Sequence, residues 1–118
     1  MKEKNIQSNV MLALSQNDCK IFRNNCGVHK TEDCRFVRYG VANPGGSDLI
    51  GWKKTTITPE MVGQSVAIFT AIEVKNAKGR PTTEQLRFIE VVKTEGGIAG
   101  VCRSVEDALS LLAGQSAS

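Results

Sequence analysis

Three segments of the chain repeat apolar residues at the three- and four-residue spacing of an amphipathic helix. The first carries Ile6, Val10 and Leu14 on one line, and the second carries Leu86, Ile89 and Val92 before Gly96-Gly97 end it. Ser104 begins the third in a capping-box-like sequence, before Leu109, Leu111 and Leu112. We therefore expect helices over residues 2–16, 82–95 and 104–114.

Between these helices the pattern changes to alternating or continuous apolar residues, which is typical of strands. The run from Ser65 to Val74 is nearly all apolar and predicts a central strand covered on both faces. A polar, glycine-containing stretch from Asn25 to Asp33 predicts a loop. The element order predicts an α/β fold with a mixed sheet. The expected strands are residues 19–24, 34–41, 48–52, 65–74 and 98–103, with one helical turn at Thr58-Pro59.

The length of 118 residues indicates a single domain over residues 1–114, followed by a flexible tail at 115–118. No apolar run is long enough to span a membrane, and the charged start is unlike a secretion signal. We therefore expect a cytoplasmic protein without a membrane partner, in the cytoplasm of a host cell if it is viral. The net charge of +3 permits a nucleic-acid partner without requiring one.

Four cysteines, Cys19, Cys26, Cys34 and Cys102, are expected to be reduced in that compartment. Cys26, His29 and Cys34 suggest zinc, but they lack the paired spacing of known zinc sites. We favour small buried or half-buried thiols over a structural metal site.

Opposite charges meet at the end of the predicted central strand, in Ile72-Glu73-Val74-Lys75. Side chains alternate along a strand, so Glu73 and Lys75 are expected on the same face. Asp48 follows a Gly-Gly turn at the start of another predicted strand, and pairing of the two strands would bring it next to Glu73.

Two carboxylates and a lysine suit phosphodiester cleavage. Asp48 and Glu73, with the backbone carbonyl of Val74, offer hard oxygen ligands for Mg²⁺. The metal ion would bind a phosphate oxygen and lower the pKa of a water, and Lys75 would orient that water or stabilise charge. The pattern therefore indicates a metal-dependent phosphodiesterase.

The same residues also carry a family resemblance. The chain has Gly45-Gly46-Ser47-Asp48, then Glu73-Val74-Lys75, Gly79-Arg80 and Gln85-x-x-Phe88, with Arg23-Asn24-Asn25 earlier and Gly96-Gly97-Ile98-Ala99 later. In order and spacing these motifs resemble the virus-type replication–repair nuclease (VRR-NUC) domain of the PD-(D/E)XK superfamily. The resemblance covers nearly the whole chain.

The resemblance implies a restriction-endonuclease-like fold, in which helices flank a central mixed sheet. It also implies a Mg²⁺-dependent endonuclease, with Mn²⁺ as a possible substitute, whose metal-binding acids match Asp48 and Glu73. The catalytic lysine and the helical glutamine of the family match Lys75 and Gln85, and Glu3 is a looser candidate for an additional acid. Stand-alone viral members are homodimers that act on branched DNA such as four-way (Holliday) junctions.

Structural alternatives stay open for several of these residues. Gln85 is also placed to close a capping box with Thr82, and Glu3 also suits a helix N-terminus. Glu73 and Lys75 would also suit a solvated pair. The expected contacts to DNA are Arg23, Asn24, Asn25, Ser47, Lys53, Lys78 and Arg80.

Three functions compete on this sequence. A structure-selective endonuclease explains all of the motifs, either as a homodimer on four-way junctions or as a monomer that nicks flaps. A non-catalytic DNA-binding module would not need the charge arrangement of Asp48, Glu73 and Lys75. A hydrolase of another phosphodiester fits the basic loop around Arg80 less well than a nuclease does.

Overall fold

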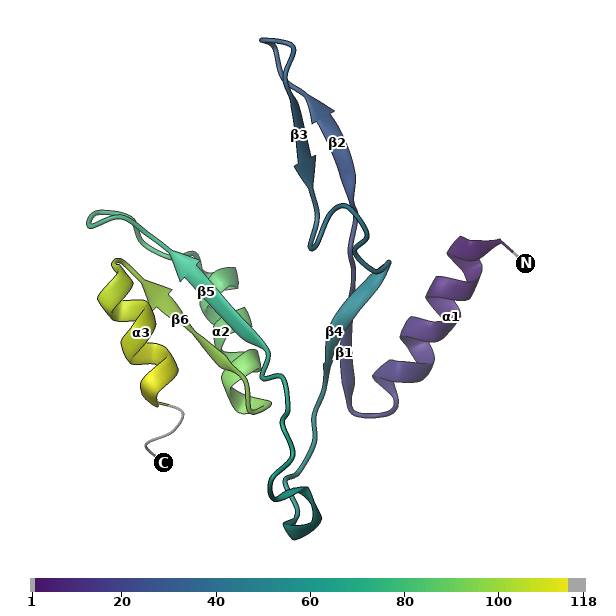
Figure 1. Cartoon of the computed structure of the whole chain (residues 1–118), viewed down its shortest axis with the longest axis vertical. Helices are drawn as coiled ribbons and strands as arrows, with labels where there is room; N and C mark the ends of the chain where they lie inside the picture. Colours follow the sequence, from purple (N-terminus) through teal and green to yellow (C-terminus); the bar gives the residue numbers. More distant parts are fainter. Residues whose placement is uncertain (1, 115–118) are drawn as a thin grey trace. The chain divides into compact units, whose positions relative to one another are not determined.

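The structure, a computed structural model, describes residues 2–114 of the chain, so the tail predicted at 115–118 lies outside the described residues. Contacts within the chain divide it into two compact units, Met1–Thr55 and Thr56–Ser118. Each unit combines helix and strand, which makes the chain a mixed α/β protein (Figure 1). The expectation of a single domain stays a prediction.

The first unit begins with helix α1, Glu3–Ser15, where a helix was predicted. Strand β1, Cys19–Arg23, pairs antiparallel with β4, Leu49–Lys53, and α1 packs against β1. The apolar stripe of α1 is only partly covered, since Ile6 and Val10 stay exposed. Helix and strand pair thus form a thin layer without a closed core.

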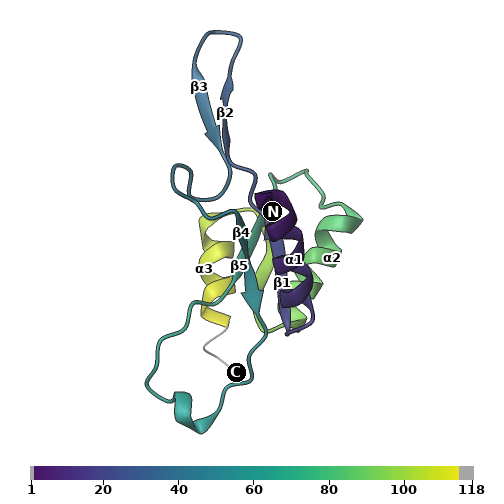
Figure 2. The same cartoon turned by 90° about the vertical axis from the view of Figure 1, so that its right-hand side faces the viewer.

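A second antiparallel pair in this unit, β2, Gly27–Lys30, and β3, Phe36–Tyr39, forms a hairpin (Figures 1 and 2). The loop prediction for residues 25–33 was therefore wrong over β2. The sequence of β2, with His29 and Lys30 beside the single apolar residue Val28, lacks the alternating pattern typical of a strand. A hairpin exposed on both faces does not need that alternation of apolar and polar residues. Cys26 and Cys34 beside the hairpin are exposed, contrary to the expectation of buried or half-buried thiols.

The second unit starts with a 3₁₀ turn, Pro59–Met61, as its Thr-Pro sequence predicted. Strand β5, Thr70–Val74, and β6, Ile98–Cys102, are parallel and joined by helix α2, Thr83–Thr94. Helix α3, Val105–Ala113, follows with Ser104 as its N-cap. The order of strand, helix and strand in this crossover was predicted.

The predicted strand over residues 65–74 is too long, because only its second half forms β5. Val66 and Ile68 are exposed and precede the strand, which begins at Thr70. A strand needs a paired neighbour, and the five residues of β6 pair only with Thr70–Val74. High β-propensity alone does not extend a strand beyond its partner.

The core of the second unit lies between β6 and the two helices. Its buried residues are Ile89, Val92, Ile98, Ala99 and Cys102, of which Val92 is fully buried. Leu86 is exposed, so the inward stripe of α2 runs through Gln85, Ile89 and Val92 rather than through Leu86. A Cβ added at Gly100 would contact Leu111, which places α3 on the sheet face opposite Glu73.

Candidate active site

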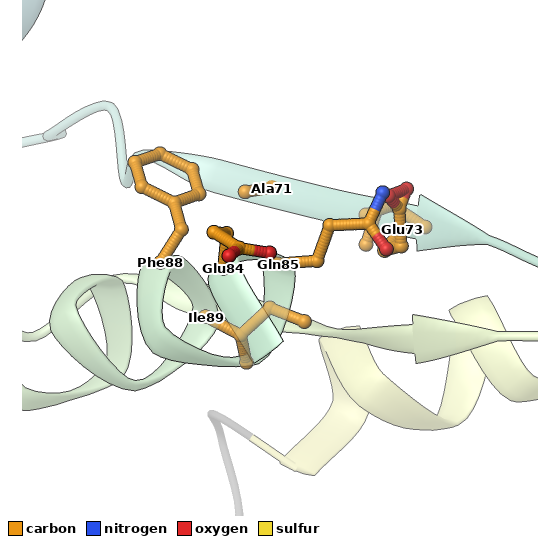
Figure 3. Close-up of a pocket in the computed structure, with 7 residues that line it drawn as sticks. Ala71, Glu73, Glu84, Gln85, Phe88 and Ile89 are labelled. Carbon is orange, nitrogen blue, oxygen red and sulfur yellow. The ribbon is translucent and has the colours of Figure 1, made fainter. Parts of the chain in front are cut away.

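Glu73 and Lys75 lie on one face of β5, as predicted. Burial alternates along the strand: Ala71, Glu73 and Lys75 are half-buried, while Ile72 and Val74 are exposed. A pocket on the α2 side of the strand is lined by Ala71, Ile72, Glu73, Glu84, Gln85, Phe88 and Ile89 (Figure 3). The carboxylate of Glu73 therefore faces a hollow between a strand end and the first turns of a helix.

Gln85 forms the capping box that the sequence offered as one alternative, and it also lines the pocket beside Glu73. The backbone N–H of Thr82 donates to Gln85 Oε1 at 2.9 Å, and the N–H of Gln85 donates to Thr82 Oγ1 at 3.1 Å. This capping box holds the side chain while the glutamine also lines the pocket that contains Glu73. In Figure 3 the amide end of Gln85 points toward Glu73, so its Nε2 is the group available to the pocket.

The carbonyl of Val74, a predicted metal ligand, points away from β6. The two sheet bonds at the ends of β5 join Phe69 O to Ile98 N and Lys75 N to Cys102 O. Successive residues of a strand present their backbone groups to opposite sides, so Val74 presents its carbonyl away from β6. In the second unit, the Val74 carbonyl thus lies at the strand edge that β6 does not occupy, whereas the Glu73 carboxylate faces the pocket on the α2 side.

Arg103 is a residue of this region that the sequence analysis missed. Its guanidinium Nη1 donates to the carbonyl oxygens of both Asn76 and Gly79, in the loop that follows Lys75. Asn76 Oδ1 accepts from the backbone N–H groups of Lys78 and Gly79, at 3.1 and 2.7 Å. The basic loop is therefore fixed by one arginine and one Asx turn.

This loop packs against the catalytic candidate Lys75. A Cβ added at Gly79 would lie 3.5 Å from both Cβ and Cδ of Lys75, an ordinary van der Waals distance, so the loop lies directly over the lysine stem. The signal in the sequence was Arg103 directly after the apolar run of β6. In a parallel pair, that position lies beside the end of β5.

Asp48 ends a loop in the first unit that Asn24 holds in place. Asn24 Nδ2 donates to the carbonyls of Val41 and Ser47 at 2.9 and 3.0 Å, and its Oδ1 accepts from Val41 N at 2.8 Å. Its own N–H donates to the Asp48 carbonyl at 2.8 Å. A Cβ added at Gly46 would overlap the Val41 carbonyl, so the Gly-Gly turn is required for this close approach.

The neighbouring candidates Arg23 and Glu3 differ in their contacts. The Arg23 guanidinium donates to Gln7 Oε1 at 2.6 Å and to Ser8 Oγ at 2.9 Å, which ties β1 to α1. Glu3 is exposed in the first turn of α1. Arg23 and Asn24 thus have intramolecular partners, and their contacts with DNA stay predictions.

The candidate residues are divided between the units. The first unit carries Asp48, Glu3, Arg23, Asn24, Asn25, Ser47 and Lys53. The second unit carries Glu73, Lys75, Lys78, Arg80 and Gln85. Over residues 2–114, no three His, Cys, Asp or Glu side chains gather closely enough to hold a metal ion. Each unit therefore carries only part of the predicted set of site residues. No helix among the described residues is long and apolar enough for a membrane span.

Comparison with known proteins gives one match. The family model described as the VRR-NUC domain matches residues 3–106, nearly the whole chain. No curated protein and no solved structure matches significantly. The matched range includes Asp48, Glu73, Lys75 and Gln85.

Proposed function

Because the chain belongs to the VRR-NUC family, which implies a nuclease, we propose that it is a metal-dependent endonuclease of branched DNA. One observation carries the proposal: Glu73 and Lys75 share a strand face, and Glu73 shares a pocket with Gln85. This is the arrangement that the family resemblance assigns to catalysis. A solvated ion pair would not need a glutamine fixed beside the acid.

The proposed fold is the PD-(D/E)XK fold of the family, with one central mixed sheet. Strands β4 and β5 each have a single paired neighbour within their own unit, β1 and β6. Pairing of β4 with β5 would place Asp48 beside Glu73, as the sequence analysis expects.

The proposed metal ligands are the carboxylates of Asp48 and Glu73 and the carbonyl of Val74, with Glu3 as a further acid. Carboxylate and carbonyl oxygens are the ligands that Mg²⁺ and Mn²⁺ prefer, so this donor set fits the ion. When bound, the ion supplies the Lewis acid that polarises the phosphate and activates water. The protein contributes the position and negative charge of the two carboxylates.

Lys75 and Gln85 act on the reacting groups in this proposal. The ammonium group of Lys75 stabilises negative charge on the phosphate or orients the attacking water. The fixed amide of Gln85 donates from Nε2 toward Glu73 or the water, since its Oε1 already accepts from Thr82. The residues proposed to hold DNA phosphates and sugars are Arg23, Asn24, Asn25, Ser47, Lys53, Lys78 and Arg80.

The preferred substrate is the four-way junction, cut by a homodimer. A chain of this size offers one site, whereas resolving a junction needs two cuts related by symmetry. A two-fold symmetric dimer matches that requirement. The alternatives are a monomer that nicks flaps and a DNA-binding module without activity.

A cleavage panel tests the proposal. Linear, flap, splayed-arm and four-way DNA are incubated with Mg²⁺, Mn²⁺ or chelator, beside Asp48→Ala, Glu73→Ala and Lys75→Ala. We expect paired cuts of the four-way junction that require the metal ion and both acids. Lys75→Ala should retain metal binding but lose turnover by roughly 100-fold or more. Full activity of either acid variant would refute the assigned site. Light scattering shows whether the protein that makes paired cuts is a dimer.

A further inference from the structure

The β2–β3 hairpin exposes apolar side chains that packing within the first unit does not explain. Phe36 is 70 % and Val37 51 % exposed, although they lie on opposite faces of the hairpin. Both views show it extending beyond the β1–β4 pair, with no element of its unit lying on it (Figures 1 and 2). An isolated two-stranded hairpin is marginally stable in water, so a bound partner would stabilise it.

The two faces of the hairpin differ in chemistry. The pairing of Val28 with Arg38 and of Lys30 with Phe36 puts all four on one face. The opposite face carries His29, Val37 and Tyr39. We call the first the basic face: an aromatic ring lies there beside two cations and a small apolar residue.

The charges of the basic face form no ion pair, whereas Asp33 and Arg35 at the hairpin tip pair with each other. Lys30 and Arg38 form no ion pair within residues 2–114. At the tip, Asp33 accepts from the Thr31 hydroxyl and from Arg35 Nε, and these bonds, led by that of Thr31, hold the pKa of Asp33 below its ordinary value. Of the two acids at the tip, Asp33 is therefore already paired with a neighbouring arginine.

We propose that the basic face binds unpaired nucleotides of the branched substrate, with Phe36 stacked on a base and Lys30 and Arg38 on phosphates. Aromatic rings beside cations are the means by which proteins bind single strands without reading sequence. An exposed ring needs an open base face, which a branch or a single-stranded arm offers and an intact duplex hides. This inference rests on the proposed nuclease function and adds the feature of the substrate that is recognised.

Fluorescence anisotropy of the full chain in chelator, which prevents cleavage, tests the inference with labelled splayed-arm and duplex DNA. Phe36→Leu keeps apolar bulk but removes the ring, and Val37→Ala is the control on the opposite face. We expect Phe36→Leu to weaken splayed-arm binding roughly 5- to 140-fold, from a stacking free energy of about 1–3 kcal/mol. Duplex binding should change less than about two-fold, and Phe36→Trp should restore splayed-arm binding.

The charges have a separate test. The double variant Lys30→Ala/Arg38→Ala should weaken binding to both DNAs and lower the salt slope of log affinity by about two. Arg35→Ala is its control, because Asp33 already pairs with Arg35. Circular dichroism confirms that each variant is folded.

Three results would overturn the inference: wild-type binding by Phe36→Leu, an equal loss in Val37→Ala, or a dimer-to-monomer change in Phe36→Leu without a loss of DNA affinity. The last would make this face an interface between copies of the chain. Metal-dependent cleavage by the wild type, measured separately, distinguishes these failures from a failure of the nuclease function.

Discussion

The two units hold their catalytic candidates by different forces. In the second unit, buried apolar side chains of α2 and β6, with Val92 only 1 % exposed, support the strand that carries Glu73. No described residue of the first unit is fully buried. There the loop that leads to Asp48 is held by hydrogen bonds of the half-buried Asn24 side chain.

The difference shows that the residues of the proposed site are held in place by two kinds of interaction, apolar burial for Glu73 and hydrogen bonds for Asp48. Apolar burial is insensitive to small changes in surface charge, whereas a single asparagine with three bonds has no substitute. Substitutions that leave the core intact are therefore expected to affect the Asp48 half more than the Glu73 half.

The largest expected effect is the loss of cleavage in Glu73→Gln. Replacing the carboxylate with an amide of the same shape removes the negative charge that holds the metal ion, and we expect at least roughly 10³-fold slower cleavage of a folded protein. Glu90→Gln, on the exposed side of α2 beside Lys93, is the control. Equal loss in both variants would point to α2 charge rather than to a site at Glu73.

The next effect concerns stability of the second unit. Val92→Ala removes two buried methyl groups and should lower the free energy of unfolding by about 2 kcal/mol. Val91→Ala, one residue earlier and 38 % exposed, should cost well under half of that. Urea denaturation of the two variants measures the contrast, and equal losses would show that the core does not lie where α2 meets β6.

Arg103 should affect catalysis without being part of the chemistry. Arg103→Ala frees the loop that packs on Lys75, and we expect single-turnover cleavage to slow by about 10-fold from the misplaced lysine. Arg103→Lys should recover part of the rate, and Mn²⁺ affinity should stay unchanged. Arg87→Ala on exposed α2 surface is the control, and lost Mn²⁺ affinity would contradict a role through Lys75.

The smallest expected effect is that of Asn24→Asp. It keeps the acceptor for Val41 N–H but removes both N–H donors, which should lower stability by about 1 kcal/mol. Cleavage should fall further than this loss of stability explains, because the Asp48 loop loosens. Urea denaturation beside Asn25→Ala gives the stability comparison, and unchanged cleavage would show that Asn24 does not position Asp48.

Local sequence rules predicted the second unit well. Thr82 and Gln85 formed the capping box, Ser104 capped the last helix, and alternation placed Glu73 and Lys75 together. These features depend on spacings of two to four residues. The length of β5 was missed because pairing with β6, and not apolar content, decides where the strand begins.

The first unit was predicted less well because its order depends on distant partners. Asn24 bonds to Val41 and Ser47, 17 and 23 residues away, and β2 is recognisable only through its pairing with β3. Arg103 was missed for the same reason, since its loop partners lie 24 and 27 residues earlier. Spacing rules cannot show such contacts, so the sequence predicted these residues as a loop or as DNA contacts, or left them unassigned.

The most direct test of the account is a double-mutant cycle on Mn²⁺ binding, with Asp48→Asn, Glu73→Gln and the double variant measured by calorimetry. If the two carboxylates hold one ion, each single replacement should weaken Mn²⁺ binding by roughly 10-fold or more. The double variant should then be far from the sum of the two effects, because each single change already disables the shared site. Effects that simply add, or wild-type Mn²⁺ affinity in either single variant, would contradict a metal site shared by Asp48 and Glu73.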